Sequence, residues 1–361
     1  MQMQSSFTSS PLNRRSFMKS GLVAGSAAAV GAGLLSKTKQ ALGDEFFPGG
    51  NLDRGDAAIL RFVAAAELLE TDLWQQYTEL GGVPSGTPNA YQNAFMNLDG
   101  DGPQYIMSNT LDEMSHAEFL NAYLASKGES PVDLDRFRTL QGSKATGAKN
   151  IGRLTNLMHL TVDTSWYIRY RSTTNPDFGA TFPQALNIVN RTAIPVTDAD
   201  FNNPTHIQVI ADIAAFHFAS IEQGGTSLYA SLGRKVTSRE VLEITLGIGG
   251  SEIAHFLEWM DFAGNAVSGP PITDGGLTFP DFNDPPNPLL QTNLIFPVPC
   301  EFINPKLPKC AVIRPLTDRF GGARAAAKGL TASGLFTGQS KEFFATLNEL
   351  AEQADAARRL F

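Results

Sequence analysis

The chain has 361 residues, of which 42% are hydrophobic and 18% are charged, so it can bury a large core. It holds 28 Lys and Arg against 36 Asp and Glu, and five of the basic residues lie in the first 43 positions, where there is no acidic residue. The remainder, with 23 basic and 36 acidic residues, is strongly acidic. This charge argues against partners such as nucleic acid or anionic lipid, because both would repel it.

Residues 1–43 have the features of an export signal. The run NRRSFMK at 13–19 resembles the twin-arginine export motif, and Gly21 to Leu35 is an Ala/Gly-rich apolar stretch of 15 residues, which suits a signal rather than a membrane span. Small residues at 41–43 predict cleavage before Asp44. We therefore expect recognition by the twin-arginine export machinery and a periplasmic or extracellular product. The alternative is an uncleaved N-terminal anchor.

Four long segments with helical periodicity follow the signal. In the first, residues on one face recur at spacings of three and four, namely Leu60, Val63, Glu67, Glu70, Trp74 and Tyr77. The segment from about 238 to 263 begins at Ser238, which is a candidate N-cap. No βαβ pattern and no glycine-rich phosphate loop is found. The sequence predicts an all-α fold, an antiparallel four-helix bundle over 54–263, with long helices at 54–82, 103–127, 205–233 and 238–263.

The connecting and C-terminal segments differ in composition. We expect a long loop at 83–102 and an inserted helix at 147–172. Residues 264–315 hold 11 of the 21 prolines, so 264–316 is predicted to be an irregular Pro-rich arm. A C-terminal helical tail is expected over 317–361. Within the arm, Cys300 and Cys310 are expected to form a disulfide in an oxidising compartment, and two free thiols are the alternative.

Two Glu-x-x-His motifs carry the strongest chemical signal. Glu113 precedes His116 by three residues, and Glu252 precedes His255 by three. On a helix, this spacing places both side chains on one face, so each motif directs a carboxylate and an imidazole toward one point. Carboxylate oxygen and neutral imidazole nitrogen are common metal ligands.

The other two long helices supply further carboxylates. A carboxylate site for two metal ions in a bundle takes one Glu from each of two helices and Glu-x-x-His from each of the other two. Glu222 fits on the third helix, and either Glu67 or Glu70 fits on the first. A partial repeat, apolar-Glu-x6-Tyr, matches Glu70 with Glu222, but the sequence leaves the choice open. The predicted metal ligands are Glu67, Glu70, Glu113, His116, Glu222, Glu252 and His255, around two ions roughly 3–4 Å apart.

The residues around these positions resemble the ferritin-like superfamily, in particular its exported branch related to desiccation-associated proteins. The resemblance covers about 54–263 and is carried by AELLE at 66–70 with Trp74, EMSH at 113–116, IE at 221–222 and SEIAH at 251–255. It implies a bundle that holds two iron or manganese ions and reacts with oxygen or peroxide in stress or desiccation protection. The long loop, inserted helix and Pro-rich arm make a hollow cage doubtful.

Other candidate residues have simpler interpretations. Tyr77 and Tyr229 can hydrogen-bond a ligand carboxylate or carry redox equivalents, although core packing is the commoner role of such aromatics. His159, His206 and His217 lack the motif spacing and are interpreted as structural. Alternatives to a redox enzyme are a non-catalytic metal-binding protein and a structural envelope protein. The sequence does not choose iron over manganese, and homo-oligomer formation stays open.

Overall fold

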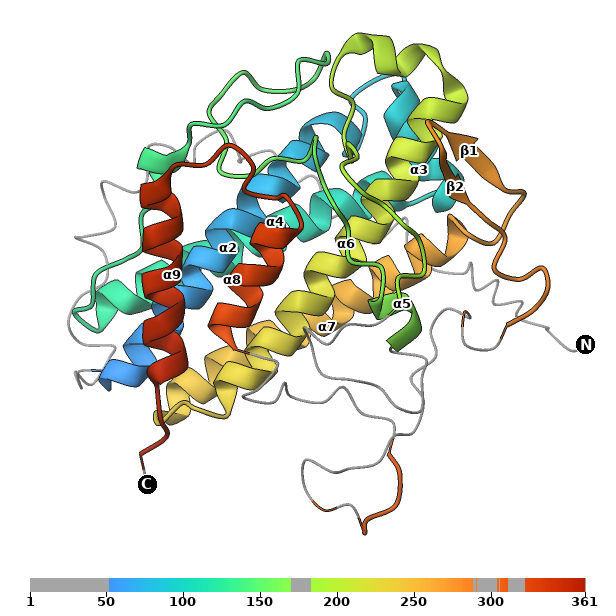
Figure 1. Ribbon diagram of the computed structural model, residues 1–361. Coiled ribbons are helices and arrows are strands. Elements are labelled where there is room, and N and C mark those ends of the chain that lie inside the picture. The colour runs from blue at the N-terminus through green and yellow to red at the C-terminus, as the bar shows by residue number, and fades with distance from the viewer. Residues whose placement is uncertain are drawn as a thin grey trace, which may run out of the picture. The chain divides into compact units, whose positions relative to one another are not determined.

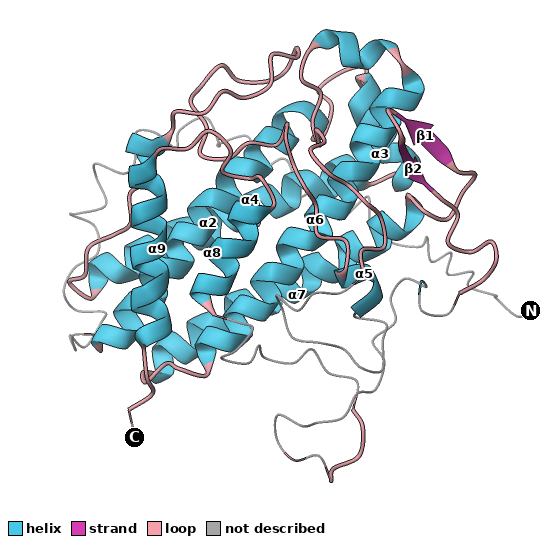
Figure 2. Ribbon diagram, viewed as in Figure 1, coloured by secondary structure: helices cyan, strands magenta, loops and turns pink. Residues whose placement is uncertain are grey.

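The computed structural model describes residues 52–169, 183–287, 290, 304, 306–310 and 322–360. They belong to a compact unit that begins at Asn51. This unit is mostly helical, as the sequence predicts (Figure 2). In the described part, no helix is both long and apolar enough to cross a membrane. The predicted signal, residues 1–43, lies outside the described residues.

Four long helices carry the candidate site (Figure 1). Two of them begin at a residue whose side chain caps the first turn: Asp53 accepts from the Gly55 N–H at 2.8 Å, and Asn203 accepts from the Thr205 N–H at 3.0 Å. Proline at the start of the third helix costs no hydrogen bond, because the first turn has no partner for that N–H. The four helices are α2 (Arg54–Gly81), α4 (Gly102–Ser126), α6 (Pro204–Gly233) and α7 (Arg239–Asn265).

The start of α7 is held differently from our expectation. Ser238 occupies the N-cap position, but its side chain makes no capping hydrogen bond. The buried carboxylate of Asp56, on α2, accepts instead from the backbone N–H groups of Thr237 at 2.8 Å and Ser238 at 2.7 Å. A carboxylate from a neighbouring helix therefore satisfies these N–H groups and fixes the end of α7 against α2.

Neighbouring long helices run antiparallel. α2 pairs with α4, and α6 pairs with α7. The first pair meets the second through stacked aromatic rings, with Trp74 5.3 Å from Trp259 and 4.8 Å from Phe218 between ring centroids. These rings are fully buried and form the core at one side of the candidate site.

The segment expected as a loop at 83–102 contains a helix, α3 (Ala90–Leu98). Asn89 caps it: its side chain accepts from the Gln92 N–H at 2.8 Å, and the Gln92 side chain accepts from the Asn89 N–H at 2.9 Å. This capping box outweighs the surrounding Pro and Gly residues. Tyr91 and Phe95 of α3 are fully buried against the core.

The inserted helix predicted at 147–172 is wrong over most of its length. Only α5 (Trp166–Arg169) is helical among the described residues of this segment. The rest lies extended, and isolated bridges pair Leu140 with Arg153 and Leu160 with Arg191. The periodic apolar residues Leu154, Leu157 and Leu160 are buried, but they belong to an extended strip that lies on the helices and not to a helix. Apolar spacing alone did not distinguish the two conformations.

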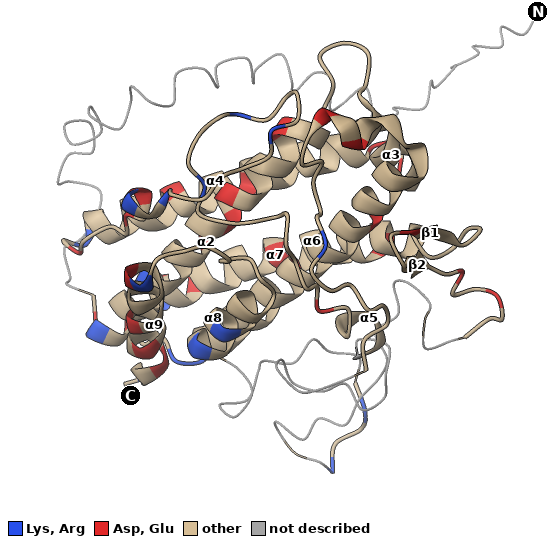
Figure 3. Cartoon of the chain, turned by 45° about the horizontal axis from the view of Figure 1, so that its top comes forward, with Lys and Arg blue, Asp and Glu red and all other residues tan. Residues whose placement is uncertain are grey.

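The C-terminal tail forms α8 (Ala323–Ala332) and α9 (Lys341–Ala356), which lie against α6 and α2 respectively (Figure 1). The charged residues of α8 are all basic, and those of α9 are mostly acidic (Figure 3). Asp355 of α9 caps α8 by accepting from the N–H groups of Ala323 at 2.9 Å and Arg324 at 3.0 Å. The tail thus packs on the long helices.

In the Pro-rich segment, β1 (Ile272–Asp274) and β2 (Leu277–Phe279) form an antiparallel hairpin with Gly275 and Gly276 at the turn. Both glycines have positive φ, which the tight turn requires. Cys310 is exposed, and Cys300 lies outside the described residues, so the predicted disulfide stays a prediction.

A buried carboxyl on α6 predicts a pH-dependent stability. Burial raises the pKa of Asp212 to about 7. A hydrogen bond that Gln208 Nε2 donates to the Asp212 carboxylate at 3.0 Å lowers the pKa but only partly offsets the effect of burial. Between about pH 4 and 7 the folded protein holds a proton that the unfolded chain releases, so this group lowers stability as pH rises. Asp212→Asn should remove the dependence and add roughly 2–4 kcal/mol at pH 8. Urea unfolding of wild type and Asp212→Asn at pH 4–8 measures this difference. The same change in unfolding free energy with pH in both proteins would contradict the prediction.

Candidate metal centre

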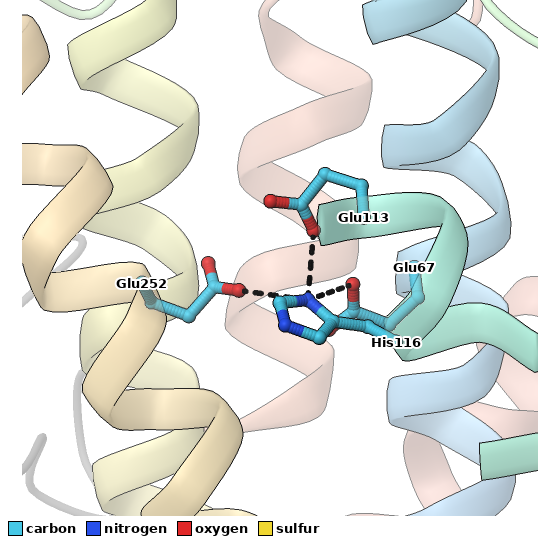
Figure 4. A group of neighbouring side chains, drawn as sticks. All are labelled: Glu67, Glu113, His116 and Glu252. Carbon is cyan, nitrogen blue, oxygen red and sulfur yellow. Dashed lines mark hydrogen bonds and ion pairs between the residues drawn. The ribbon is translucent and has the colours of Figure 1, made fainter. Parts of the chain in front are cut away.

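Six of the seven predicted ligands meet in the interior between the four long helices. They form two groups in which one potential ligand atom from each residue lies within 4.8 Å of all the others. Glu113 and Glu252 belong to both groups. Figure 4 shows the first group, with Glu67 from α2, Glu113 and His116 from α4, and Glu252 from α7. The second group consists of Glu113, Glu222, Glu252 and His255.

Each group is centred on the Nδ1 atom of its histidine. His116 Nδ1 lies 3.2 Å from Glu113 Oε2, 3.4 Å from Glu67 Oε2 and 3.8 Å from Glu252 Oε1. His255 Nδ1 lies 3.1 Å from Glu113 Oε1 and 3.3 Å from Glu222 Oε2. The two oxygens of Glu113 therefore face different histidines, as a carboxylate that bridges two ions would.

Glu70, the alternative ligand on α2, belongs to neither group. Glu67 and Glu70 are one turn apart, and only Glu67 is directed at His116 (Figure 4). The Tyr229 hydroxyl donates a hydrogen bond to Glu67 Oε1, so Tyr229 is in contact with a candidate ligand. Tyr77 is directed elsewhere, toward His217.

The far nitrogens of the two histidines are also occupied. His255 Nε2 is 3.1 Å from Asp112 Oδ2, and His116 Nε2 is 3.1 Å from Ser251 Oγ. Asp112 and Ser251 each directly precede the glutamate of one motif, and each contacts the histidine of the other motif. Such contacts fix the ring orientation and leave Nδ1 directed at the carboxylates. We did not predict this exchange, although the repeated polar residue before Glu was its signal.

Asn109 links the carboxylates to the aromatic core. Its Nδ2 donates to Glu113 Oε1 at 2.9 Å and to Glu222 Oε1 at 3.1 Å, and its Oδ1 accepts from Trp259 Nε1 at 2.6 Å. Asn109 is four residues before Glu113, on the same face of α4. The role of Asn109 depends on α6 and α7, which are distant in the chain, so the local sequence around Asn109 gives no sign of it.

Burial places an electrostatic cost on the carboxylates. It raises the pKa of Glu67 to about 8, with a further rise from the charge of Glu113, against the lowering effect of His116. Burial also raises the pKa of Glu252 well above its usual range. Although burial acts the same way on Glu113, hydrogen bonds from His116 and His255 lower its pKa to about 2. Several buried carboxylates close together are unfavourable unless positive charge lies beside them.

The histidines show the complementary effect. Burial alone lowers the pKa of His116, but hydrogen bonds to Glu113 and Glu67 outweigh it and raise the pKa to about 10. The same balance, led by the charge of Glu222 against burial, raises the pKa of His255 far above its usual range. Without metal, protons thus supply the positive charge, and metal binding would displace them.

The remaining histidines lie apart from the two groups. His159 is exposed and contacts Asn190 Oδ1 at 3.2 Å. His206 lies between Asp274 and Asp200 at the start of α6. His217 is buried and pairs with the Tyr77 hydroxyl at 2.8 Å.

Two adjacent glycines of α6 supply a test of the site that changes no ligand. A Cβ at Gly225 would overlap Oε2 of Glu252, whereas a Cβ at Gly224 would meet no atom within 4 Å. Gly225→Ala should therefore displace the Glu252 carboxylate and lower metal content by about tenfold or more at limiting metal. Gly224→Ala, the control, should keep the metal and gain up to about 1 kcal/mol of stability. Metal analysis after dialysis decides it, and equal metal content in the two variants would contradict the placement of Glu252.

No protein-family model, no curated protein and no solved structure matches this chain. Its function is therefore inferred from the chain's own residues and geometry.

Proposed function

We propose that this protein is an exported ferritin-like di-metal carboxylate protein, which uses two iron or manganese ions for redox chemistry with oxygen or peroxide. The observation that carries the proposal is the pair of ligand groups sharing Glu113 and Glu252. Each group contains one imidazole and three carboxylates, a donor set suited to these metals.

The helix order supports the ferritin-like part of the proposal. α2 and α4 form one antiparallel pair, α6 and α7 form the other, and one long connection between α4 and α6 joins them. A single long crossover between two helical hairpins is the ferritin-like arrangement, with the Glu and Glu-x-x-His ligands projecting inward. Here Glu67 and Glu222 occupy the single-Glu helices, and the two motifs occupy α4 and α7.

Unsatisfied oxygen atoms support the fit to metal. Both carboxylate oxygens of Glu252 are shielded from solvent and have no hydrogen-bond partner among the described residues. A buried carboxylate without a partner is strongly unfavourable. Cations held between Glu252, Glu113 and the two histidines would remove that cost.

Iron or manganese held by these residues would supply redox chemistry toward oxygen or peroxide. The chain's residues position and shield the metal site. Asp112 and Ser251 orient the two imidazoles. Asn109 orients Glu113 and Glu222 by donating a hydrogen bond to each carboxylate. The Tyr229 hydroxyl donates a hydrogen bond to Glu67. Burial raises the pKa of Tyr229 well above its usual range, so the phenol stays protonated.

The metal centre comes close to the protein surface at Asp112. The Asp112 side chain is 54% exposed and contacts His255, which is itself only 7% exposed. Ser251 is partly buried and contacts His116 in the same way that Asp112 contacts His255. Export of a folded, metal-loaded protein through the twin-arginine route, followed by a role in oxidative or desiccation stress, is consistent with such a site.

Turnover tests the proposal. The wild-type protein, loaded anaerobically with Fe²⁺ or Mn²⁺, should convert many equivalents of hydrogen peroxide to water and oxygen, or should consume many equivalents of oxygen when ascorbate is supplied as the electron donor. Glu113→Gln should reduce the rate by about 100-fold or more, while His159→Ala should leave it unchanged. Binding of both ions with no consumption of either oxidant would overturn the redox role and favour a non-catalytic metal-binding protein.

A further inference from the structure

A second buried site lies beside the metal centre but uses different residues. It is a cavity of about 90 Å³ between α2, α6, α8 and the extended strip at Val162. We call it the α8 cavity, because Ala326, Gly329 and Leu330 of α8 line it. Its wall is largely apolar and includes Phe62, Leu228 and Leu330. This volume exceeds what one water needs and is smaller than a cavity of about 150 Å³ that accepts benzene.

Two buried polar atoms in this wall have no partner. Glu70 Oε2 and His217 Nε2 are shielded from solvent, have no hydrogen bond within the described part of the chain, and belong to residues lining the cavity. An unpaired buried polar group is unfavourable. Two of them in one cavity point to a missing hydrogen-bonding group.

The state of His217 defines that group. Burial lowers the pKa of His217 to about 3 and raises the pKa of Tyr77 well above its usual range, so the pair is a neutral imidazole and an intact phenol. The Tyr77 hydroxyl lies 2.8 Å from His217 Nδ1 and makes no other hydrogen bond in the described structure, so we assign the phenol as the donor. The single ring proton of His217 then lies on Nε2, which is a donor. Burial, with the charge of Glu67, raises the pKa of Glu70 well above its usual range, so its carboxyl group is neutral and keeps a carbonyl oxygen that accepts a hydrogen bond. The cavity thus offers one acceptor on Glu70 and one donor, the His217 Nε2–H.

A hydroxyl group matches both atoms, because it donates one hydrogen bond and accepts another. We propose that the α8 cavity binds a small alcohol of about three to five carbon atoms, with its hydroxyl between Glu70 and His217 and its alkyl chain against the apolar wall. This assigns Glu70 a role distinct from metal binding. Glu70 and His217 lie outside both ligand groups, so the inference extends beyond the proposed function.

The test compares 1-butanol with diethyl ether, an isomer that cannot donate a hydrogen bond. Binding to the purified protein is measured by saturation-transfer NMR. 1-Butanol should bind about fivefold to tenfold more tightly than the ether. Glu70→Leu should abolish this preference, and Glu70→Gln, which keeps an acceptor oxygen, should retain it. An equal preference in wild type and Glu70→Leu would overturn the proposal.

Substitutions at two glycines distinguish filling of the cavity from a general effect on folding. Gly224 lines the cavity and has open space around its Cβ position, so Gly224→Leu should fill the cavity and abolish 1-butanol binding. Gly250 on α7 is exposed with equal open space, and Gly250→Leu should bind like wild type. Undiminished binding to Gly224→Leu, or no binding to wild type because water alone fills the site, would overturn the cavity assignment.

Metal content measured in the same samples separates the two proposals. If Gly224→Leu keeps its metal and loses 1-butanol, both stand. If no variant binds metal but the pattern of alcohol binding holds, the α8 cavity stands and the metal centre falls. If metal binds and Gly224→Leu still takes up 1-butanol, the metal centre stands and the α8 cavity falls.

Discussion

Glu113→Gln and Glu252→Gln should each remove both metal ions, whereas His116→Ala and His255→Ala should each remove mainly one. The reason is that the two glutamates belong to both ligand groups and each histidine belongs to only one. Bound metal should fall from about two ions per chain to near zero for the glutamate variants and to about one for the histidine variants. Metal analysis after gel filtration measures this, with His159→Ala as the unaffected control.

Glu252→Gln should not weaken the metal-free fold. Glu252→Gln removes a buried carboxylate whose oxygens have no hydrogen-bond partner in the described structure, so the melting temperature of the metal-free protein should not fall. A residue kept for metal binding costs stability when the metal is absent. Glutamate variants that lose one ion only would show that Glu113 and Glu252 are not shared ligands, and a lower melting temperature of metal-free Glu252→Gln would show that the Glu252 carboxylate stabilises the fold.

Asp72→Ala should cost about 3–5 kcal/mol of unfolding free energy, although Asp72 lies outside the metal centre. Its buried carboxylate accepts from the N–H groups of Leu154 at 3.0 Å and Thr155 at 2.9 Å, and from Arg138 Nη1 at 2.6 Å. These bonds fix the extended strip to α2. Removing them leaves two backbone donors without a partner.

Asp135→Ala is the matched control. Asp135 also pairs with Arg138, at 2.9 Å, but its side chain is 80% exposed. Its loss should cost less than about 1 kcal/mol. Urea unfolding of the metal-free variants compares the two carboxylates on the same arginine. A loss below 1 kcal/mol for Asp72→Ala would mean that the strip is held by its apolar residues alone.

The sequence predicted well which Glu and His side chains come together between the long helices, because their information is local. Glu113 with His116, and Glu252 with His255, are paired by helical spacing within one segment. The choice between Glu67 and Glu70 was not predictable in this way. Both lie on one face of α2, and only the position of α4 decides that Glu67 meets His116.

The misplaced helix shows a different limit. Leu154, Leu157 and Leu160 have a spacing that a helix can use, yet they lie in an extended strip. What selects the strip is Asp72, 82 residues before Leu154, which accepts hydrogen bonds from backbone N–H groups that a helix would use internally. Nothing in the local pattern carries that information. For α3, by contrast, the Asn89 and Gln92 capping box was a local signal that we gave too little weight.

The central claim is tested most directly by anomalous X-ray diffraction of protein purified from its native compartment with iron and manganese supplied, combined with elemental analysis. We predict about two iron or manganese ions per chain, with anomalous density between Glu113 and Glu252 beside His116 and His255. Absence of a bound transition metal, or density at residues outside this set, would contradict the account.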